Sequence, residues 1–221
     1  RVVFIYQNPR DLSTFSNIIN KYNKNNNKLI VGSGLPKDYL KKNLNLQWSN
    51  NKIIKKHYEK INFIYCARLL KSKGIIDFIN LSTKLESYDF NVYGDIDLFS
   101  KDSLTEIEIS KYSKKNKNLK FNGVKNNPLI DNDSKFPILV IPSNYGEGLP
   151  RSILEALALK IPVICTKNAS CEVFSEDFFN ISDNNVNSYI STFQKLLDDY
   201  HKKIISTKLE RGYQFVKNSL T

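Results

Sequence analysis

The chain changes its pattern of hydrophobic and polar positions near residue 60. From there on, short apolar runs alternate with stretches whose apolar residues recur at helical spacing. The apolar runs predict strands at residues 63–66, 90–93, 119–121, 138–141, 163–165 and 178–181. The spaced stretches predict helices at residues 75–85, 104–112, 153–158, 189–200 and 203–216. Such alternation favours parallel β-α-β units, so we expect an α/β fold with a Rossmann-like, doubly wound parallel sheet.

The first sixty residues follow a different pattern. They predict a strand at 2–6, a helix at 9–22 with Pro9 near its start, and a strand at 28–31 that leads into Gly32-Ser33-Gly34. The polar stretch after it, with the basic run 52–60, reads as a loop or a weak helix.

The composition indicates a globular protein but does not identify its binding partner. Among 221 residues, 41% are hydrophobic, enough for a packed core, and 33 Lys and Arg against 22 Asp and Glu give a net charge of +11. That charge suits nucleic acid, an anionic membrane surface or a phosphorylated small molecule. Much of the surplus lies in Lys- and Asn-rich stretches that read as solvated surface. Because the lysines are scattered, we expect no nucleic-acid partner.

The cysteines and apolar runs indicate the compartment. Cys66, Cys165 and Cys171 are odd in number and lack C-x-x-C spacing, which fits a reducing cytosol. No apolar run approaches the roughly 20 residues that cross a bilayer, so we expect neither a transmembrane helix nor a signal peptide. Since the chain starts at Arg1 and contains no Met, we expect a segment of a longer, cytoplasmic protein.

One candidate site follows the strand at 138–141. Pro150 suits the first turn of the next helix, which places Glu147, Gly148 and Leu149 in a strand-to-helix loop. In an open α/β sheet, ligands bind beyond the carboxyl ends of the strands, where helix N-termini favour phosphates. Gly148 lets a ligand approach the backbone closely. The loop is therefore placed to meet an anionic ligand.

Glu155 follows in that helix and shares its polar face with Arg151 and Ser152. Both Glu147 and Glu155 are able to accept hydrogen bonds from sugar or ribose hydroxyls. The alternative is that Arg151 and Glu155 form only an ion pair on the helix surface.

A second candidate site follows the strand at 63–66. Residues 67–74, Ala-Arg-Leu-Leu-Lys-Ser-Lys-Gly, again connect a strand to a helix, and Arg68 and Lys73 are suited to neutralise a diphosphate. The alternative is an ordinary solvated loop, since a basic loop alone is a weak signal.

These motifs together resemble a known family, the retaining glycosyltransferases of family four, which have the GT-B fold. Residues 65–74 resemble its G-R-L…K-G segment with Ala67 for Gly, and Glu147 and Glu155 resemble its paired glutamates. Residues 90–95, which contain Gly94, resemble its V-G-D turn. Further matches are Phe121-Asn122-Gly123, Pro142-Ser143 and residues 161–166.

The resemblance implies roles for these residues. Arg68 and Lys73 would hold the donor's diphosphate and stabilise the charge on it as the glycosidic bond breaks, without a metal or other cofactor. Glu147 would orient the donor sugar, and Glu155 would accept hydrogen bonds from the ribose. The implied donor-binding residues are Gly94, Gly148, Leu149, Arg151 and Glu155, with backbone N–H groups acting at positions 148 and 149. Transfer would retain the anomeric configuration, with no protein nucleophile.

The resemblance also implies a domain organisation. Residues 1–34 would end an acceptor-side domain, residues 35–60 would be a linker or excursion, and residues 61–221 would bind the nucleotide-sugar donor. The rest of the acceptor domain, in cis or as a separate chain, would complete the enzyme.

The partners expected from this resemblance are a nucleotide-sugar, UDP-linked by preference, and a saccharide or lipid-linked acceptor in polysaccharide or glycolipid synthesis. A peripheral contact with the anionic inner face of the cell membrane is a further expectation. Two alternatives stay open: a UDP-sugar 2-epimerase of GT-B architecture, and a non-catalytic nucleotide- or polyanion-binding module.

Overall fold

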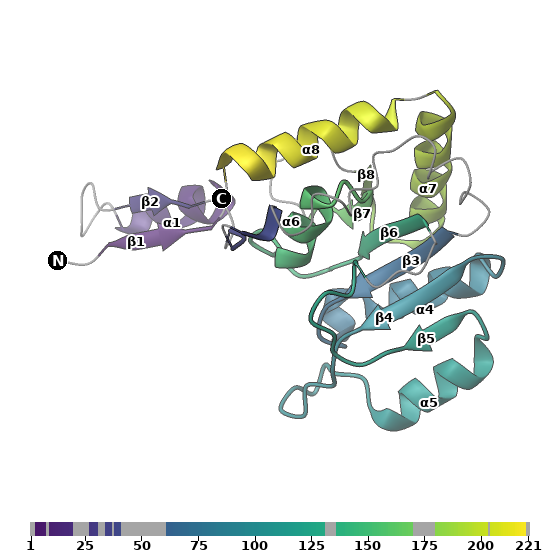
Figure 1. The fold of residues 1–221 in the computed structure, drawn as a ribbon. Helices are drawn as coiled ribbons and strands as arrows, with labels where there is room; N and C mark the ends of the chain where they lie inside the picture. Colours follow the sequence, from purple (N-terminus) through teal and green to yellow (C-terminus); the bar gives the residue numbers. More distant parts are fainter. Residues whose placement is uncertain are drawn as a thin grey trace.

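The computed structural model describes residues 3–7, 9–19, 27–30, 34–36, 38–40, 61–130, 136–169, 180–202 and 204–219. Its main feature is a sheet of six strands in the order β5-β4-β3-β6-β7-β8, with every neighbouring pair parallel. The strands are β3 (Ile61–Cys66), β4 (Asp89–Tyr93), β5 (Leu119–Phe121), β6 (Phe136–Ile141), β7 (Val163–Thr166) and β8 (Asn180–Ser182). The predicted Rossmann-like, doubly wound parallel sheet is confirmed (Figure 1).

The strand order reverses between β3 and β6. The chain moves outward from β3 to β5, then returns so that β6 pairs with the other side of β3, with Phe63 opposite Ile138. Where the loops after two neighbouring strands run in opposite directions, a crevice opens at the carboxyl ends of those strands. Ligands bind in this crevice in open α/β sheets. The fold therefore places a ligand crevice beside the loops that follow β3 and β6.

Each helix predicted beyond residue 60 is present. They are α4 (Ile75–Lys84), α5 (Glu106–Lys115), α6 (Arg151–Ala158), α7 (Val186–His201) and α8 (Ile205–Ser219), with the 3-10 turn η2 (Lys71–Lys73) before α4. Caps set two of the starts. A capping box between Thr105 and Glu108 begins α5, and the Asn185 side chain accepts a hydrogen bond from Ser188 N at the start of α7.

The predicted position of Pro150 is wrong by one residue. It is the N-cap of α6, with ψ 133°, and the helix begins at Arg151. The φ of Pro150, −57°, suits both the N-cap and the first helical residue, but its extended ψ places it before the first turn.

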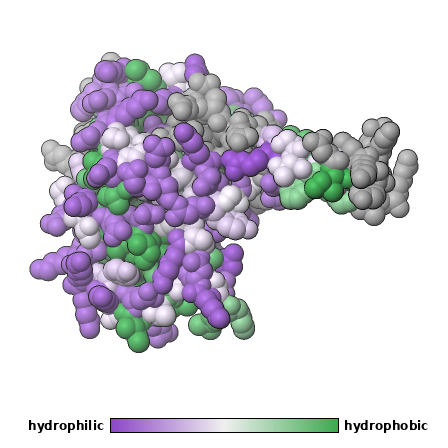
Figure 2. All heavy atoms as spheres, turned by 180° about the vertical axis from the view of Figure 1, so that it is seen from behind, coloured by the Kyte–Doolittle hydropathy of each residue, from purple (hydrophilic) through white to green (hydrophobic). Residues whose placement is uncertain are grey.

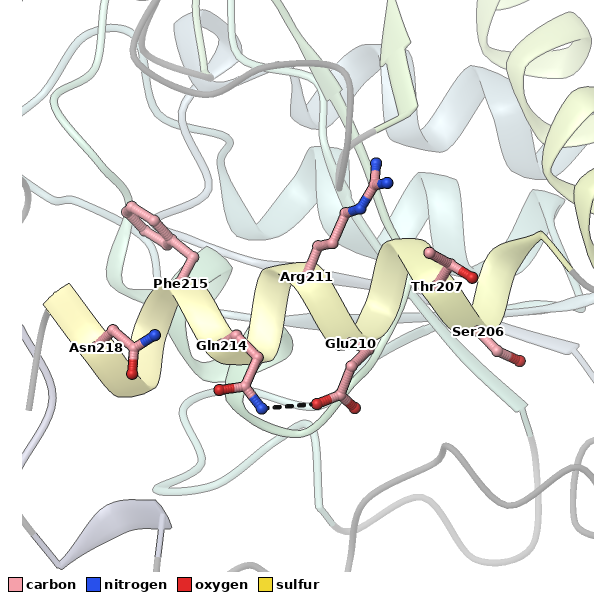
Figure 3. A pocket seen from close by; sticks show the side chains of 7 residues that line it. All are labelled: Ser206, Thr207, Glu210, Arg211, Gln214, Phe215 and Asn218. Carbon is pink, nitrogen blue, oxygen red and sulfur yellow. Dashed lines mark hydrogen bonds between the residues drawn. The ribbon is translucent and has the colours of Figure 1, made fainter.

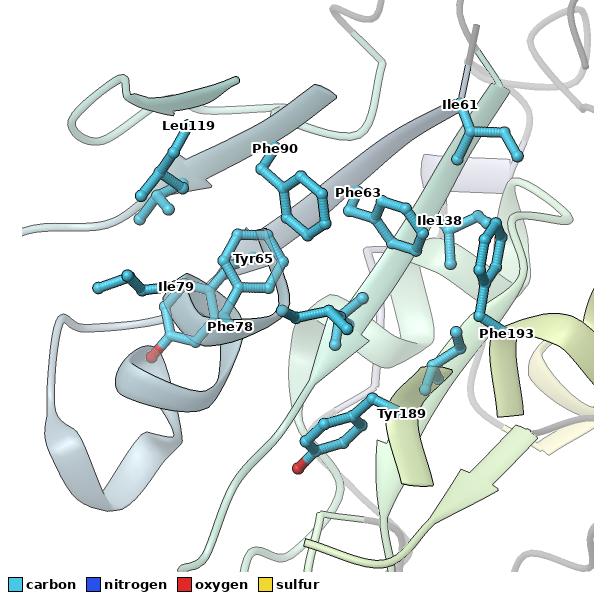
Figure 4. Close-up of a cluster of buried hydrophobic side chains, with 14 of the residues drawn as sticks. Ile61, Phe63, Tyr65, Phe78, Ile79, Phe90, Leu119, Ile138, Tyr189 and Phe193 are labelled. Atoms are coloured by element: carbon cyan, nitrogen blue, oxygen red, sulfur yellow. The ribbon is translucent and has the colours of Figure 1, made fainter. Parts of the chain in front are cut away.

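Two cores lie on opposite faces of the sheet because strand residues alternate between the faces. Phe63 and Tyr65 of β3 pack in the core that contains α4 and α7, whereas Ile64 packs in the core formed with α6. In the first core, Phe63 stacks on Phe90 with ring centroids 4.7 Å apart and meets Phe193 of α7 edge-on (Figure 4). This aromatic cluster fixes β3 and β4, whose carboxyl ends carry candidate residues.

The N-terminal residues form a small unit that projects beside the sheet (Figure 1). It comprises β1 (Phe4–Tyr6), α1 (Pro9–Ile19) and β2 (Asn27–Leu29), with the two strands parallel. Pro9 is the first residue of α1, as its fixed φ favours. The predicted motif 32–34, the basic run 52–60, Cys171 and residues 178–179 lie partly or wholly outside the described residues. The predicted domain boundaries stay predictions.

The surface is mainly polar. Figure 2 shows mostly hydrophilic side chains on the side opposite Figure 1, with hydrophobic ones in small scattered groups. Within the described ranges, no helix combines the length and the apolar character that a membrane span requires.

Candidate functional site

A cavity of about 500 Å³ opens beyond the carboxyl ends of β3, β4 and β5 and beside the first turns of α6. Its walls come from four segments that are far apart in the sequence. The lining residues are Cys66, Ala67, Arg68, Tyr93, Gly94, Asp95, Val124, Lys125, Asn126, Pro128, Arg151, Ser152 and Glu155. The size is typical of a small-molecule site, and the position is the crevice that the strand order creates.

Gly94 shapes this cavity by close approach. A Cβ added at Gly94 would lie 1.9 Å from the carbonyl oxygen of Ala67. The loop after β4 is therefore able to pack against the loop after β3 only because residue 94 has no side chain. Both loops contribute walls to the cavity.

The loop that carries Arg68 and Lys73 is held by hydrogen bonds to its backbone. Tyr65 Oη donates to the carbonyl of Arg68 over 2.9 Å. The Asp102 carboxylate accepts hydrogen bonds from Ser72 N, at 2.9 Å, and from the Ser72 hydroxyl. These contacts order a loop that would otherwise be a flexible basic segment.

Gly74 and Ser72 join this loop to the loop between β6 and α6. Gly74 has a left-handed φ of 77°, and a Cβ there would lie 1.9 Å from the carbonyl oxygen of Pro142. Asn144 N donates to the carbonyl of Ser72 over 2.9 Å. The two candidate motifs found in the sequence are therefore parts of one braced surface.

Three ion pairs hold the cations that were predicted for the site, Arg68, Lys73 and Arg151. Arg68 Nη1 lies 2.6 Å from Asp97 Oδ2, Lys73 Nζ lies 2.8 Å from Glu147 Oε2, and Arg151 Nε lies 2.9 Å from Glu155 Oε1. Lys73 and Glu147 are mostly buried, whereas the guanidinium side chains of Arg68 and Arg151 are largely exposed. An incoming anion therefore meets two arginines that are accessible but already paired.

The structure separates the predicted residues into groups. Arg68, Gly94, Arg151 and Glu155 line the cavity. Lys73 and Glu147 pair with each other and are not among its lining residues.

Gly148 and Leu149 also lie outside the cavity lining. The Leu149 side chain is buried in the core shared with α6, so only its backbone is available to a ligand. A Cβ on Gly148 would lie 3.0 Å from Gln7 Oε1, so the close approach predicted for a ligand is made by a side chain of the N-terminal unit.

Burial controls the protonation of two cavity residues. It raises the pKa of Glu155, although the Arg151 side chain hydrogen-bonds to it and opposes the shift. Burial also raises the pKa of the Cys66 thiol, and the Glu155 carboxylate adds to that shift. The cavity therefore presents a partly desolvated carboxyl group next to a neutral thiol.

Sequence reasoning missed several residues of this surface. Asp97 holds Arg68, Asp102 holds Ser72, and Lys125 lines the cavity with its Nζ 5.7 Å from the Tyr93 ring centroid. Lys125 follows β5, so the rule that the carboxyl ends of parallel strands share one edge could have found it. The two aspartates carry no such signal because their loop shows no motif.

The described ranges contain no group of three or more His, Cys, Asp or Glu placed to hold a metal ion. A second hollow, of about 590 Å³, runs along α8. Figure 3 shows its lining side chains, Ser206, Thr207, Glu210, Arg211, Gln214, Phe215 and Asn218, all from that helix. It contains none of the predicted site residues.

Solved structures share this fold at low sequence identity. A glycosyltransferase from Rickettsia africae aligns with 99% of the chain at 16% identity and a TM-score of 0.76. Anabaena Alr3699/HepE in complex with UDP-glucose aligns with 99% at 16% identity and a TM-score of 0.74. Sucrose-phosphate synthase from Thermosynechococcus elongatus aligns with 98% at 18% identity and a TM-score of 0.73.

The chain spans only part of these proteins, namely 59%, 59% and 54% of their respective lengths. No curated protein sequence matches it.

A family comparison covers most of the chain. The sequence model of the family described as "Glycosyl transferases group 1" matches residues 46–211, which includes the sheet from β3 to β8 and every predicted site residue. The sequence motifs, the strand order and the family match all indicate the same family. The chain belongs to the glycosyl transferases group 1 family and corresponds to the C-terminal half of a GT-B glycosyltransferase.

Proposed function

We propose that this chain is the donor-binding half of an enzyme that transfers a sugar from a nucleotide-sugar to a saccharide or lipid-linked acceptor. The observation that carries the proposal is the cavity at the reversal of strand order, lined by Arg68, Arg151 and Glu155. Its charges and hydrogen-bonding groups suit a phosphorylated, hydroxyl-rich ligand. Two structures of Anabaena Alr3699/HepE with this fold are complexes with UDP and with UDP-glucose, which supports UDP as the nucleotide.

In this proposal the cavity binds the nucleoside diphosphate. Glu155 accepts hydrogen bonds from the ribose hydroxyls, since it lines the cavity and Arg151 is the one ion-pair partner it has among the described residues. Arg68 binds the diphosphate and stabilises the charge that develops on it as the glycosidic bond breaks. Because Arg68 pairs with Asp97, diphosphate binding exchanges or extends that ion pair.

Lys73 and Glu147 act at the end of the donor that carries the sugar. They lie on the braced surface formed by the two loops, beside the cavity rather than among its lining residues. Glu147 orients the sugar through its hydroxyls, and Lys73 adds positive charge toward the diphosphate. Backbone N–H groups at Gly148 and Leu149 complete the binding of the donor. Transfer proceeds with retention and requires no metal.

The acceptor is bound by a further domain, contributed in cis or by a separate chain. Gln7 of the N-terminal unit already approaches Gly148, so the unit lies where such a domain would meet the donor loop. The surplus of lysine supports a peripheral contact with the anionic inner face of the cell membrane. Liposome co-sedimentation with and without anionic lipid tests that contact.

Calorimetric titration with UDP, ADP, GDP and inorganic phosphate tests the proposed ligand class. We expect UDP to bind most tightly and phosphate alone to bind weakly, because the cavity contacts more than the diphosphate. Absence of binding by every nucleotide at millimolar concentration contradicts the proposal. Binding of inorganic phosphate as tightly as any nucleotide favours the polyanion-binding module instead.

A further inference from the structure

Tyr145 is an exposed aromatic residue on the loop that joins β6 to α6. Its side chain is 60% exposed. The backbone beneath it is fixed, because the Ser143 hydroxyl accepts a hydrogen bond from Tyr145 N and donates one to Tyr145 O, each over 3.2 Å. The loop is anchored further by Thr166 Oγ1, which donates to the carbonyl of Ser143 over 2.6 Å. The ring is therefore presented to solvent from an ordered segment.

The ring lies near Lys73, which forms a mostly buried ion pair with Glu147. Lys73 Nζ is 5.6 Å from the Tyr145 ring centroid and 2.8 Å from Glu147 Oε2. A cation at that distance is attracted to the electron-rich face of the ring and helps to hold its orientation. Because 60% of the side chain is exposed, much of the ring is accessible to a ligand, and Glu147 follows two residues later in the same loop.

The backbone next to the ring is not crowded. A Cβ added at Gly146 would meet Arg10 Nη1 at 4.0 Å and, apart from its two chain neighbours, no other described atom within 4 Å. A ligand that reaches this loop finds an aromatic ring, a carboxylate and an ammonium group on one surface. None of these three side chains is among the cavity lining residues.

This combination fits a pyranose. A pyranose ring presents C–H groups on its faces and hydroxyls around its edge, so an aromatic face and a neighbouring carboxylate match both features. We propose that Tyr145 is a specificity-determining residue whose ring stacks on the sugar of the nucleotide donor, while Glu147 accepts hydrogen bonds from the hydroxyls of that sugar. The inference rests on the proposed function, since the cavity must hold the nucleotide.

The test compares two ligands that differ only in the sugar, UDP and UDP-glucose, by calorimetry on the 221-residue chain. Tyr145→Ala should lower the affinity for UDP-glucose about three- to tenfold and leave that for UDP within about twofold. Tyr145→Phe keeps the ring and should behave as the unchanged chain. Thermal melts show whether Tyr145→Ala is folded, and Tyr145→Leu replaces it if it is not.

The outcomes separate this inference from the proposed function. If the unchanged chain binds neither ligand, the proposed function fails, and the role of Tyr145 fails with it. If UDP binds but Tyr145→Ala affects both ligands equally or neither of them, only the inference is overturned. An equal loss for both ligands assigns Tyr145 a structural role over the Lys73–Glu147 pair.

Discussion

Lys73 Nζ lies 2.8 Å from Glu147 Oε2, so the basic loop after β3 and the glutamate loop after β6 meet in one mostly buried ion pair. Solvent screens this pair less than an exposed one, so it should contribute about 1 kcal/mol to the free energy of unfolding.

A double-mutant cycle with Lys73→Ala and Glu147→Gln measures this coupling in urea unfolding. The more exposed pair of Lys71 and Glu108, at 3.2 Å, is the control and should show a smaller coupling energy. Equal coupling energies in the two pairs would mean that burial of Lys73 and Glu147 does not strengthen their interaction.

Gly74 is required by the close approach of its loop to Pro142. Gly74→Ala should lower the free energy of unfolding by more than about 3 kcal/mol, because a left-handed φ and an overlap with the Pro142 carbonyl act together. Gly123→Ala is a matched control. Gly123 has a φ of 66° and no described atom lies within 4 Å of an added Cβ, so this substitution should cost about 1 to 2 kcal/mol. Equal costs in urea unfolding would contradict the proposed bracing of the loops.

Glu155 should make stability depend on pH. Burial raises its pKa in the folded chain, so the folded state binds its proton more tightly than the unfolded state does. Ionisation of Glu155 therefore reduces stability as the pH rises through the folded-state pKa, and the effect vanishes well below the ordinary pKa of a glutamate. Glu155→Gln should raise the melting temperature at pH 7, and the gain should shrink toward about pH 4.

The same substitution should weaken UDP binding if Glu155 contacts the ribose. Glu86→Gln, at an exposed position, is the control for a general effect of removing one negative charge. A lower melting temperature for Glu155→Gln at pH 7 would show that its ion pair with Arg151 outweighs the cost of burial.

Asp97 competes with the ligand for Arg68. Asp97→Asn removes a negative charge 2.6 Å from the guanidinium, so UDP affinity should rise about two- to fivefold at low salt, with a smaller gain at high salt. The gain should vanish in chains that also carry Arg68→Ala. A loss of affinity in Asp97→Asn would instead mean that Asp97 orients Arg68 for binding. Calorimetry at two salt concentrations distinguishes these results.

The sheet was predictable because its strands are buried on both faces and therefore appear as continuous apolar runs, as at 138–141. Arg68 and Glu147 could be selected because each follows such a strand, at the edge where ligands bind. Their partners were harder to find. Asp97 reaches Arg68 through a loop without a repeating pattern, and the packing of Gly74 on Pro142 depends on tertiary contact that the local sequence does not encode.

The contacts of the N-terminal unit were not predictable either. Gln7 follows a strand of a separate two-stranded sheet, and only the folded chain shows that it lies against Gly148. Tyr145 was overlooked because one aromatic residue between a strand and a helix carries no periodic signal. Its proximity to Lys73 becomes visible only when the two loops are brought together.

Calorimetric titration of UDP into the unchanged chain and into three variants shows whether the cavity binds the donor nucleotide. If the cavity at the reversal of strand order binds the donor nucleotide, Arg68→Ala and Glu155→Ala should each weaken UDP binding by at least about tenfold. Arg211→Ala, in the separate hollow along α8, should leave it unchanged. UDP binding that is insensitive to Arg68 and Glu155, or that is lost in Arg211→Ala, would contradict donor binding in this cavity.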